Sequence, residues 1–284
     1  MPSVISAPIL AHREVAPRHF VLTLHAPPIA ASAQPGQFVQ VRGVDWVDPL
    51  LPRPFSVMRA HRDKGDIEIL YRVVGKGTAL MTRWQPGGNA QVFGPLGKPF
   101  QLFPYGARVL IGGGVGIPPL LMLAEQCGRR PEAMRAATVV LQGARTADQL
   151  LCVEDFQRTG VTLELATDDG STGHHGLVTD LLKPHISRLQ ARYGTVEVFT
   201  CGPMAMMRAV AETCRDGGVG CQVCLEAPMP CGFGVCMGCV VKVRGAWEIG
   251  QGSRRIKGWT MERHYKRVCH DGPVFDANEV VWDE

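Results

Sequence analysis

The chain has 284 residues, of which 45% are hydrophobic and 20% charged, and its formal net charge is +4. This length and balance favour about two or three small globular domains, and so modest a charge gives no reason to expect binding to nucleic acid. No secretory signal opens the sequence, and the uncharged run 109–124 is too short and too interrupted by glycine and proline to span a bilayer. We therefore expect a cytoplasmic protein that binds neither nucleic acid nor membrane.

Residues 1–103 contain β-forming runs separated by glycine and proline. One short helical segment, residues 78–84, interrupts them. Many short strands with a single helix are typical of a closed antiparallel barrel. The runs expected to form strands are residues 19–25, 36–43, 53–61, 65–75 and 89–97.

Residues 104–221 alternate between strand and helix patterns, which predicts a parallel sheet covered on both faces. Such a sheet binds ligands outside the carboxyl ends of its strands. At about residue 222 the alternation stops, and residues 222–284 form a third, small module. The expected fold is multidomain: an antiparallel β-barrel, an α/β parallel-sheet domain and a small C-terminal module.

The third module begins with a loop rich in glycine and cysteine. Its sequence CGFGVCMGC places Cys231, Cys236 and Cys239 in the spacing C-x4-C-x2-C. Plant-type 2Fe-2S ferredoxins have this spacing and take a fourth cysteine from further along the chain. The one downstream cysteine is Cys269, so these four residues are the candidate cluster ligands.

Zinc is the main alternative, because four thiolates also suit a structural zinc site. Such sites usually use two C-x2-C pairs, and this loop holds one, so the iron–sulfur interpretation is favoured. Cys221 and Cys224 form another C-x2-C pair, but a spacing of three on a strand directs them to opposite faces. We expect them to be ordinary thiols. The same interpretation applies to Cys127, Cys152 and Cys214.

Within the β-rich region, the segment RPFS (53–56) combines three useful side chains. Arg53 offers a bidentate donor to a pyrophosphate, Phe55 an apolar face and Ser56 a hydroxyl. Further along, Gly77 and Thr78 open the expected helix, and a helix N-terminus attracts anions.

This combination resembles the ferredoxin reductase superfamily, whose barrel holds FAD through an Arg-x-aromatic/aliphatic-Ser motif. The resemblance implies that Arg53 contacts the FAD phosphates, that Phe55 lies near the isoalloxazine and that Ser56 lies near the reactive flavin nitrogen. Tyr71 and Arg72 would add stacking and charge. The candidate FAD-binding residues are Arg53, Pro54, Phe55, Ser56, Leu70, Tyr71, Arg72, Gly77 and Thr78.

A glycine-rich turn, GGGVGIPP (112–119), follows a predicted strand and opens a helix, as phosphate-binding turns do. TDDGS (167–171) and CGPM (201–204) end two further strands and therefore lie on the same edge. The superfamily places its nicotinamide there, with Cys201 close to the ring. Arg145 follows the second strand of this region and could meet the 2′-phosphate of NADP. No second basic residue lies beside it, so NAD is favoured over NADP. The candidate NAD-binding residues are Gly112, Gly113, Gly114, Gly116, Asp168, Cys201, Gly202 and Pro203.

Taken together, the barrel, the nucleotide domain and the cysteine loop resemble the electron-transfer subunits of the class 1B dihydroorotate dehydrogenases. One departure is the stretch from Cys239 to Cys269, which is longer than typical and contains the basic run 253–267. That run either docks a partner or is a solvated insertion. The motifs that carry the resemblance are YRVVGKGT, GPLGKPF, GGGVGIPPLL, TDDGSTGHHGLVTD, CGPMAMM and CHDGPVF.

The resemblance implies a partner, an FMN-containing dihydroorotate dehydrogenase catalytic subunit, in a heterotetramer that serves pyrimidine synthesis. Electrons would pass from FMN through the 2Fe-2S cluster and FAD to NAD+. Hydride transfer moves two electrons and a 2Fe-2S cluster accepts one, so the flavin must stand between them. No substrate-binding barrel is evident in this chain, which on this interpretation needs no catalytic acid or base of its own.

Two other functions fit parts of the pattern. The same redox centres would serve an NADH-dependent ferredoxin reductase or a sulfide dehydrogenase subunit with a different partner. Alternatively, zinc at the four cysteines would make the chain a nucleotide-binding regulator without turnover.

Overall fold

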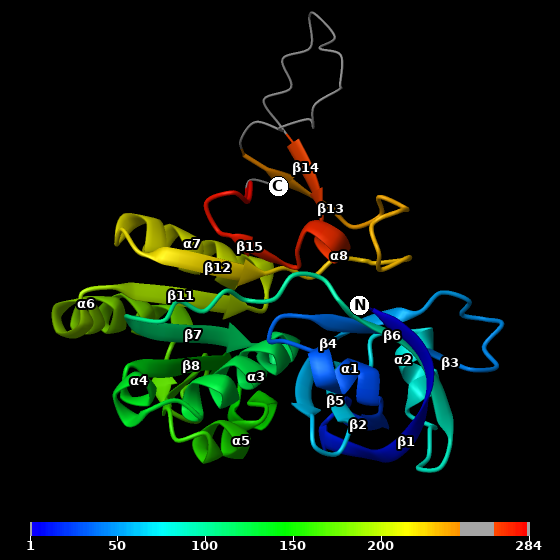
Figure 1. Cartoon of the computed structure of the whole chain (residues 1–284). Coiled ribbons are helices and arrows are strands. Elements are labelled where there is room, and N and C mark those ends of the chain that lie inside the picture. The colour runs from blue at the N-terminus through cyan, green and yellow to red at the C-terminus, as the bar shows by residue number, and fades with distance from the viewer. Residues whose placement is uncertain (1, 245–263, 283–284) are drawn as a thin grey trace, which may run out of the picture.

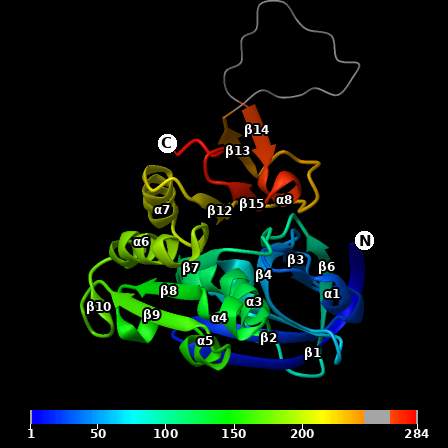
Figure 2. The same ribbon diagram turned by 60° about the vertical axis from the view of Figure 1, so that its left-hand side comes forward.

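The computed structural model describes residues 2–244 and 264–282, and the basic run 253–267 therefore lies mostly outside the described residues. The chain forms a closed barrel, an α/β sheet domain beside it, and a small C-terminal module that lies over both (Figures 1 and 2). The predicted fold class is confirmed. None of the helices in the described parts of the chain is long and apolar enough to cross a membrane.

The barrel is antiparallel throughout, with strand order β1-β2-β5-β4-β3-β6. Alternate residues fill its interior: Ile67, Ile69 and Tyr71 of β5 are all at most 2% exposed. The elements are β1 (Ser3–Ala16), β2 (His19–His25), α1 (Pro27–Ser32), β3 (Phe38–Gly43), β4 (Arg53–His61), β5 (Asp66–Arg72), α2 (Lys76–Met81) and β6 (Asn89–Leu96).

Two elements of the barrel were not predicted, β1 and α1. Strand β1 pairs with both β2 and β6 and so closes the barrel, yet it carries few buried residues and contains Pro8. A proline argues against a central strand, and here it lies beside a register irregularity that begins at Ile9. Helix α1 starts with Pro27 and Pro28, which suit a first helical turn.

The second domain is a seven-stranded sheet in the order β10-β9-β8-β7-β11-β12-β15, parallel except for β15. All seven residues of β7 are buried, as expected of a strand covered on both faces. Its strands are β7 (Ala107–Gly113), β8 (Thr138–Ala144), β9 (Thr162–Thr167), β10 (His174–His175), β11 (Val196–Cys201), β12 (Gly220–Cys224) and β15 (Val274–Asp276).

Helices cover both faces of this sheet. Leu120 of α3 and Phe156 of α5 pack on one face, and Ile186 of α6 and Met207 of α7 pack on the other. The helices are η1 (Gly114–Gly116), α3 (Ile117–Gly128), α4 (Glu132–Ala136), η2 (Ala147–Gln149), α5 (Val153–Arg158), η3 (Val178–Leu181), α6 (Leu182–Tyr193) and α7 (Met204–Asp216).

The C-terminal module contains the hairpin β13 (Val240–Val243) and β14 (His264–Arg267), followed by α8 (Val268–Asp271). The chain then returns to the sheet domain, where β15 pairs antiparallel with β12. Sheet and module are therefore joined by backbone hydrogen bonds, and the expected boundary after residue 221 falls within β12.

Phe199 of β11 offers a test of the sheet core. It is fully buried and meets Phe100 edge to face, with ring centroids 5.6 Å apart. We expect Phe199→Ala to lower the free energy of unfolding by about 3–5 kcal/mol, because the cavity removes both packing and apolar burial. Urea unfolding measures the change. Phe103→Ala is the control, since Phe103 is 52% exposed and should cost less than about 0.5 kcal/mol.

Candidate functional site

The strand order of the sheet reverses at β7, which lies between β8 and β11. In open α/β sheets, ligands bind at such a point, outside the carboxyl ends of the strands. Here Gly112 of β7 lies opposite Cys201 of β11. A Cβ atom added at Gly116 would lie 2.4 Å from the backbone C and O atoms of Cys201. The predicted glycine turn and Cys201 therefore meet at the switch point, in a contact that only glycine permits.

The outer side of the glycine turn is open. Gly114 has a φ of +56°, and a Cβ atom there would meet nothing within 4 Å. Helix α3 starts directly after the turn, with prolines in its first turn, and its first N–H groups can face an anion. Gly202, with a φ of +150°, packs against the backbone of Gly113 and is followed by Pro203. This edge can hold the phosphates of a dinucleotide.

Asp168 lies at the same edge, directly after β9, where its N–H donates to the carbonyl oxygen of Ala144 at 3.1 Å. Its side chain is exposed. Arg145, the residue considered for a 2′-phosphate, follows β8 and is also exposed.

Cys201 is 1% exposed and lies opposite Cys224 of β12. Contact with the Cys224 thiol, together with burial, raises the pKa of Cys201 well above its usual value, so this thiol stays protonated. Glu226 follows β12 at the same edge, and desolvation raises the pKa of its carboxyl group. No motif in the sequence marks Glu226, although its position just after a strand at the ligand-binding edge is a usable signal.

The flavin-motif residues begin β4, beside β3. The Arg53 guanidinium lies against the start of α2, where a Cβ atom added at Gly77 would be 3.0 Å from Arg53 Nε. Thr78 Oγ1 accepts hydrogen bonds from the N–H groups of Val74 and Gly75, at 3.0 and 3.1 Å, and so shapes the turn before α2. A guanidinium beside a glycine-containing turn provides the donors that a pyrophosphate needs.

Tyr71 lies inside the barrel and is 2% exposed. Its ring stacks on Phe20, with centroids 5.5 Å apart, and contacts Phe55 at 5.7 Å. Its hydroxyl lies 2.9 Å from His12 Nε2, and burial raises its pKa. Tyr71 thus packs against Phe55 from inside the barrel. Of its neighbours on β5, Leu70 is buried and Arg72 is exposed.

The four predicted cluster ligands lie as two pairs. Cys239 Sγ and Cys269 Sγ are 3.2 Å apart and buried, whereas Cys231 interacts with the exposed Cys236. Two pairs of thiols suit a binuclear cluster, which takes four cysteines for two irons, while zinc takes four ligands around one ion. Among the described residues, no three His, Cys, Asp or Glu side chains already surround a single metal position.

The loop around Cys231 favours a thiolate at that residue, whereas burial and contact with Cys239 raise the pKa of Cys269. Burial raises the pKa of Cys231, but hydrogen bonds from backbone N–H groups of the same loop outweigh this and lower the pKa to about 6. Gly232 and Gly234 have φ angles of +80° and +88°. Successive N–H groups in such conformations form concave anion sites. The loop therefore fits a negatively charged iron–sulfur centre.

Gln40 connects the cysteine loop to the barrel. It lies on β3 opposite Pro54, is 1% exposed, and donates through Nε2 to the carbonyl oxygen of Met229 at 2.6 Å. A Cβ atom added at Gly232 would lie 2.6 Å from the Gln40 side chain. The loop is thus seated on the strand next to the flavin motif. No sequence signal separates Gln40 from an ordinary strand residue.

Comparison with known proteins identifies the family. The iron-sulfur cluster binding domain of dihydroorotate dehydrogenase B matches residues 226–281, and the oxidoreductase NAD-binding domain matches residues 110–212. The electron transfer subunit of dihydroorotate dehydrogenase B (NAD(+)) from Desulforamulus reducens is 36% identical over the full length of both chains. The chain belongs to this family. The Bacillus caldolyticus subunit is 39% identical over 96% of each chain.

Solved structures share the fold of this chain. The structure of an NADH-dependent reduced ferredoxin-NADP oxidoreductase, from a study of flavin-based electron bifurcation, has a TM-score of 0.77 and 30% identity, covering 98% of this chain and 90% of that one. A Neisseria gonorrhoeae ferredoxin NADP+ reductase shares the fold, with a TM-score of 0.61, 19% identity, and coverage of 76% and 92%.

The predicted family and electron-transfer function are confirmed. The chain is an NAD-linked oxidoreductase subunit that carries an iron–sulfur cluster binding domain.

Gly116 tests the nucleotide edge. In Gly116→Ala, the added methyl group would push the turn away from β11, because the atoms it meets are backbone. We expect a loss of about 1–3 kcal/mol in unfolding free energy and weaker NADH binding, measured by urea unfolding and by NADH titration of the flavin absorbance. Gly220→Ala is the matched control, since its nearest contact would be Glu197 Cγ at 3.9 Å. Equal effects of the two substitutions would contradict this assignment.

Proposed function

We propose that this chain carries electrons between an FMN-containing dihydroorotate dehydrogenase catalytic subunit and NAD+, in a cytoplasmic heterotetramer that serves pyrimidine synthesis. The observation that carries the proposal is the Gln40 contact, which seats the cysteine loop beside the flavin-motif strand. The flavin-motif strand β4 itself packs against α3, which begins at the glycine turn. A nucleotide site, a flavin site and a cluster site thus adjoin in that order.

Each domain contributes one site in this proposal. The barrel, residues 1–103, holds FAD, residues 104–221 bind NAD, and residues 222–284 hold the cluster. When bound, FAD exchanges hydride with the nicotinamide and single electrons with the cluster, which links the two-electron and one-electron couples.

In this proposal, residues of the barrel bind FAD and orient its reactive ring. Arg53 and the turn at Gly77 would hold the FAD pyrophosphate, while Ser56 would present its hydroxyl near the reactive flavin nitrogen. Phe55 would lie near the isoalloxazine, with Tyr71 fixing its ring from behind. The remaining assigned flavin contacts are Pro54, Leu70, Arg72 and Thr78.

At the sheet edge, the glycine turn would hold the nucleotide phosphates, and Cys201 would lie close to the nicotinamide. Its thiol is buried and stays protonated, so it would place no charge beside the ring. The remaining assigned NAD contacts are Gly112, Gly113, Gly114, Gly116, Asp168, Gly202 and Pro203.

The catalytic subunit would dock on the outer side of the cysteine loop. There Phe233, Val235 and Met237 are 51%, 71% and 53% exposed, around the exposed Cys236. Clustered apolar side chains on a surface are typical of protein interfaces. A partner that covers them would bring its own redox centre next to the cluster.

Reconstitution tests the proposal. Co-expressed with an FMN-containing dihydroorotate dehydrogenase subunit, the chain should co-purify with it, and the complex should reduce NAD+ when dihydroorotate is added. Anaerobically purified chain alone should show flavin and iron–sulfur absorbance that bleaches with NADH. A colourless protein with one equivalent of zinc would refute the redox assignment.

A ferredoxin or another reductase as the partner is the second candidate. The 30% identity to the NADH-dependent reduced ferredoxin-NADP oxidoreductase structure, over 98% of this chain, favours it. Co-purification separates the two candidates, because this alternative predicts no stable association with the FMN subunit and rapid NADH-dependent reduction of ferredoxin.

The cysteine assignment is tested by Cys236→Ser. We expect complete loss of the iron–sulfur absorbance with full retention of FAD, because the two sites use different residues. Iron analysis and the visible spectrum provide the measurement. Cys214→Ala, which removes a buried thiol of α7, should keep the cluster. Loss of FAD together with the cluster would contradict separate sites.

A further inference from the structure

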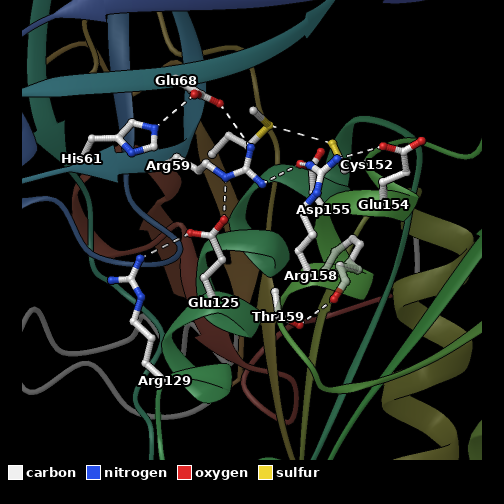
Figure 3. A network of polar contacts seen from close by, with 12 residues as sticks. Arg59, His61, Glu68, Glu125, Arg129, Cys152, Glu154, Asp155, Arg158 and Thr159 are labelled. Atoms are coloured by element: carbon white, nitrogen blue, oxygen red, sulfur yellow. Dashed lines mark hydrogen bonds and ion pairs between the residues drawn. The ribbon is translucent and has the colours of Figure 1, made fainter. Parts of the chain in front are cut away.

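Arg59 is a largely buried cation at the contact between the barrel and the sheet domain. Its side chain is 15% exposed and is surrounded by three carboxylates (Figure 3). Arg59 Nε donates to Glu125 Oε1 at 2.5 Å, Nη2 lies 2.9 Å from Asp155 Oδ1, and Nη1 lies 3.4 Å from Glu68 Oε2. One guanidinium thus uses donors on several sides, which lysine could not reproduce.

The three carboxylates come from different parts of the fold. Glu68 lies on β5, within the same barrel as Arg59, whereas Glu125 lies on α3 and Asp155 on α5 of the sheet domain. Two of the three ion pairs therefore cross the contact between domains. All three carboxylates are shielded to a similar degree, with side chains 17%, 22% and 20% exposed.

The network is closed by neighbours that hold the carboxylates in place. Arg158 pairs with Asp155 at 3.0 Å, His61 Nε2 lies 3.1 Å from Glu68, and Arg129 lies 3.9 Å from Glu125 (Figure 3). Of these, Arg129 and Arg158 are mostly exposed, so their pairs contribute little by themselves. The three pairs of Arg59, two of which cross between the domains, are the shielded ones, and removing one partner of a buried pair is costly.

The position of Arg59 along the chain links the network to both proposed cofactor sites. It lies on β4, the strand that begins with the flavin motif and contains Ser56. Glu125 lies on α3, the helix that begins immediately after Gly116 of the glycine turn. The Arg59–Glu125 pair therefore connects the strand that would orient the flavin to the helix that would orient the nucleotide.

We propose that Arg59 is a positioning residue, which fixes the sheet domain against the barrel through Glu125 and Asp155 so that nicotinamide and flavin meet in reactive geometry. This inference rests on the proposed flavin and NAD sites. Hydride transfer needs reacting atoms about 3–3.5 Å apart, and a displacement of about 1 Å can reduce the rate by about 100-fold. Arg59 acts through the relative placement of two rigid elements and touches neither cofactor.

The test compares two isosteric substitutions in the same network. Glu125→Gln weakens an ion pair between the domains, and Glu68→Gln weakens one within the barrel. The full-length protein, loaded with FAD and cluster, is mixed rapidly with saturating NADH, and flavin bleaching is followed. We expect the rate to fall about 10- to 100-fold in Glu125→Gln and less than about 2-fold in Glu68→Gln, because a pair within the barrel does not set the placement of the sheet domain. FAD content and the NADH dissociation constant should be unchanged in both.

Hydrogen exchange supplies a readout independent of turnover. In the protein without NADH, amides of β4 and α3 should exchange faster in Glu125→Gln than in Glu68→Gln, while amides of β2 and β6 stay unchanged. Asp155→Asn, which also weakens a pair between domains, should reproduce the Glu125→Gln result and serves if that variant does not fold. Arg59→Lys should give an intermediate rate.

Equal rate losses in Glu125→Gln and Glu68→Gln would overturn the proposal, because the network would then act only through general stability. An unchanged bleaching rate in Glu125→Gln and Asp155→Asn would overturn it as well. If NADH failed to bleach the flavin of the unaltered protein, the proposed function would be refuted instead. Hydrogen exchange would then still test the positioning role, because unchanged exchange of β4 and α3 in Glu125→Gln would refute it.

Discussion

The antiparallel pairing of β15 with β12 is the contact on which the cluster site depends. The N–H of Leu225 donates to the carbonyl oxygen of Pro273, and the N–H of Ala277 donates to that of Cys221. These bonds return the end of the chain to the sheet, and α8, which directly precedes this return, then places Cys269 against Cys239. Sheet formation thus brings the proposed fourth ligand to the other three, although it lies 30 residues beyond Cys239 in the sequence.

The same sheet determines where the nucleotide can bind. Strand β7 is buried on both faces, and the strand order of the sheet reverses at β7. The turn after β7 therefore faces an open edge of the sheet, where β9 and β11 also end. Close backbone packing at Gly116 holds that turn against Cys201. The barrel contributes a separate turn at Gly77, beside Arg53. Two candidate phosphate sites are therefore present, one at the turn that precedes α3 and one beside the start of β4, and α3 packs against β4.

Features set by local chemistry could be predicted from the sequence. The glycine turn, the RPFS segment and the spacing of the cysteines each have a local physical reason, and the opposite faces of Cys221 and Cys224 follow from strand periodicity. In the structure, Cys221 packs in one core cluster and Cys224 in the other. Features set by distant partners could not be predicted. Strand β1 is identified only by its two neighbours, and β15 only by β12. Gln40 and Arg59 gain their roles from Met229 and from Glu125 and Asp155, residues far away in sequence.

The exposed side chains around Cys236 also bear on how long the folded chain survives in a cell. Any protein that binds only the folded form shifts the folding equilibrium in its favour by mass action, by about 2.7 kcal/mol when its concentration is 100 times its dissociation constant. A cover over Phe233, Val235 and Met237 would also reduce the exposure of Cys236, which lies among them. If the proposed partner covers that loop, the stability of the folded chain would therefore rise with the concentration of the partner.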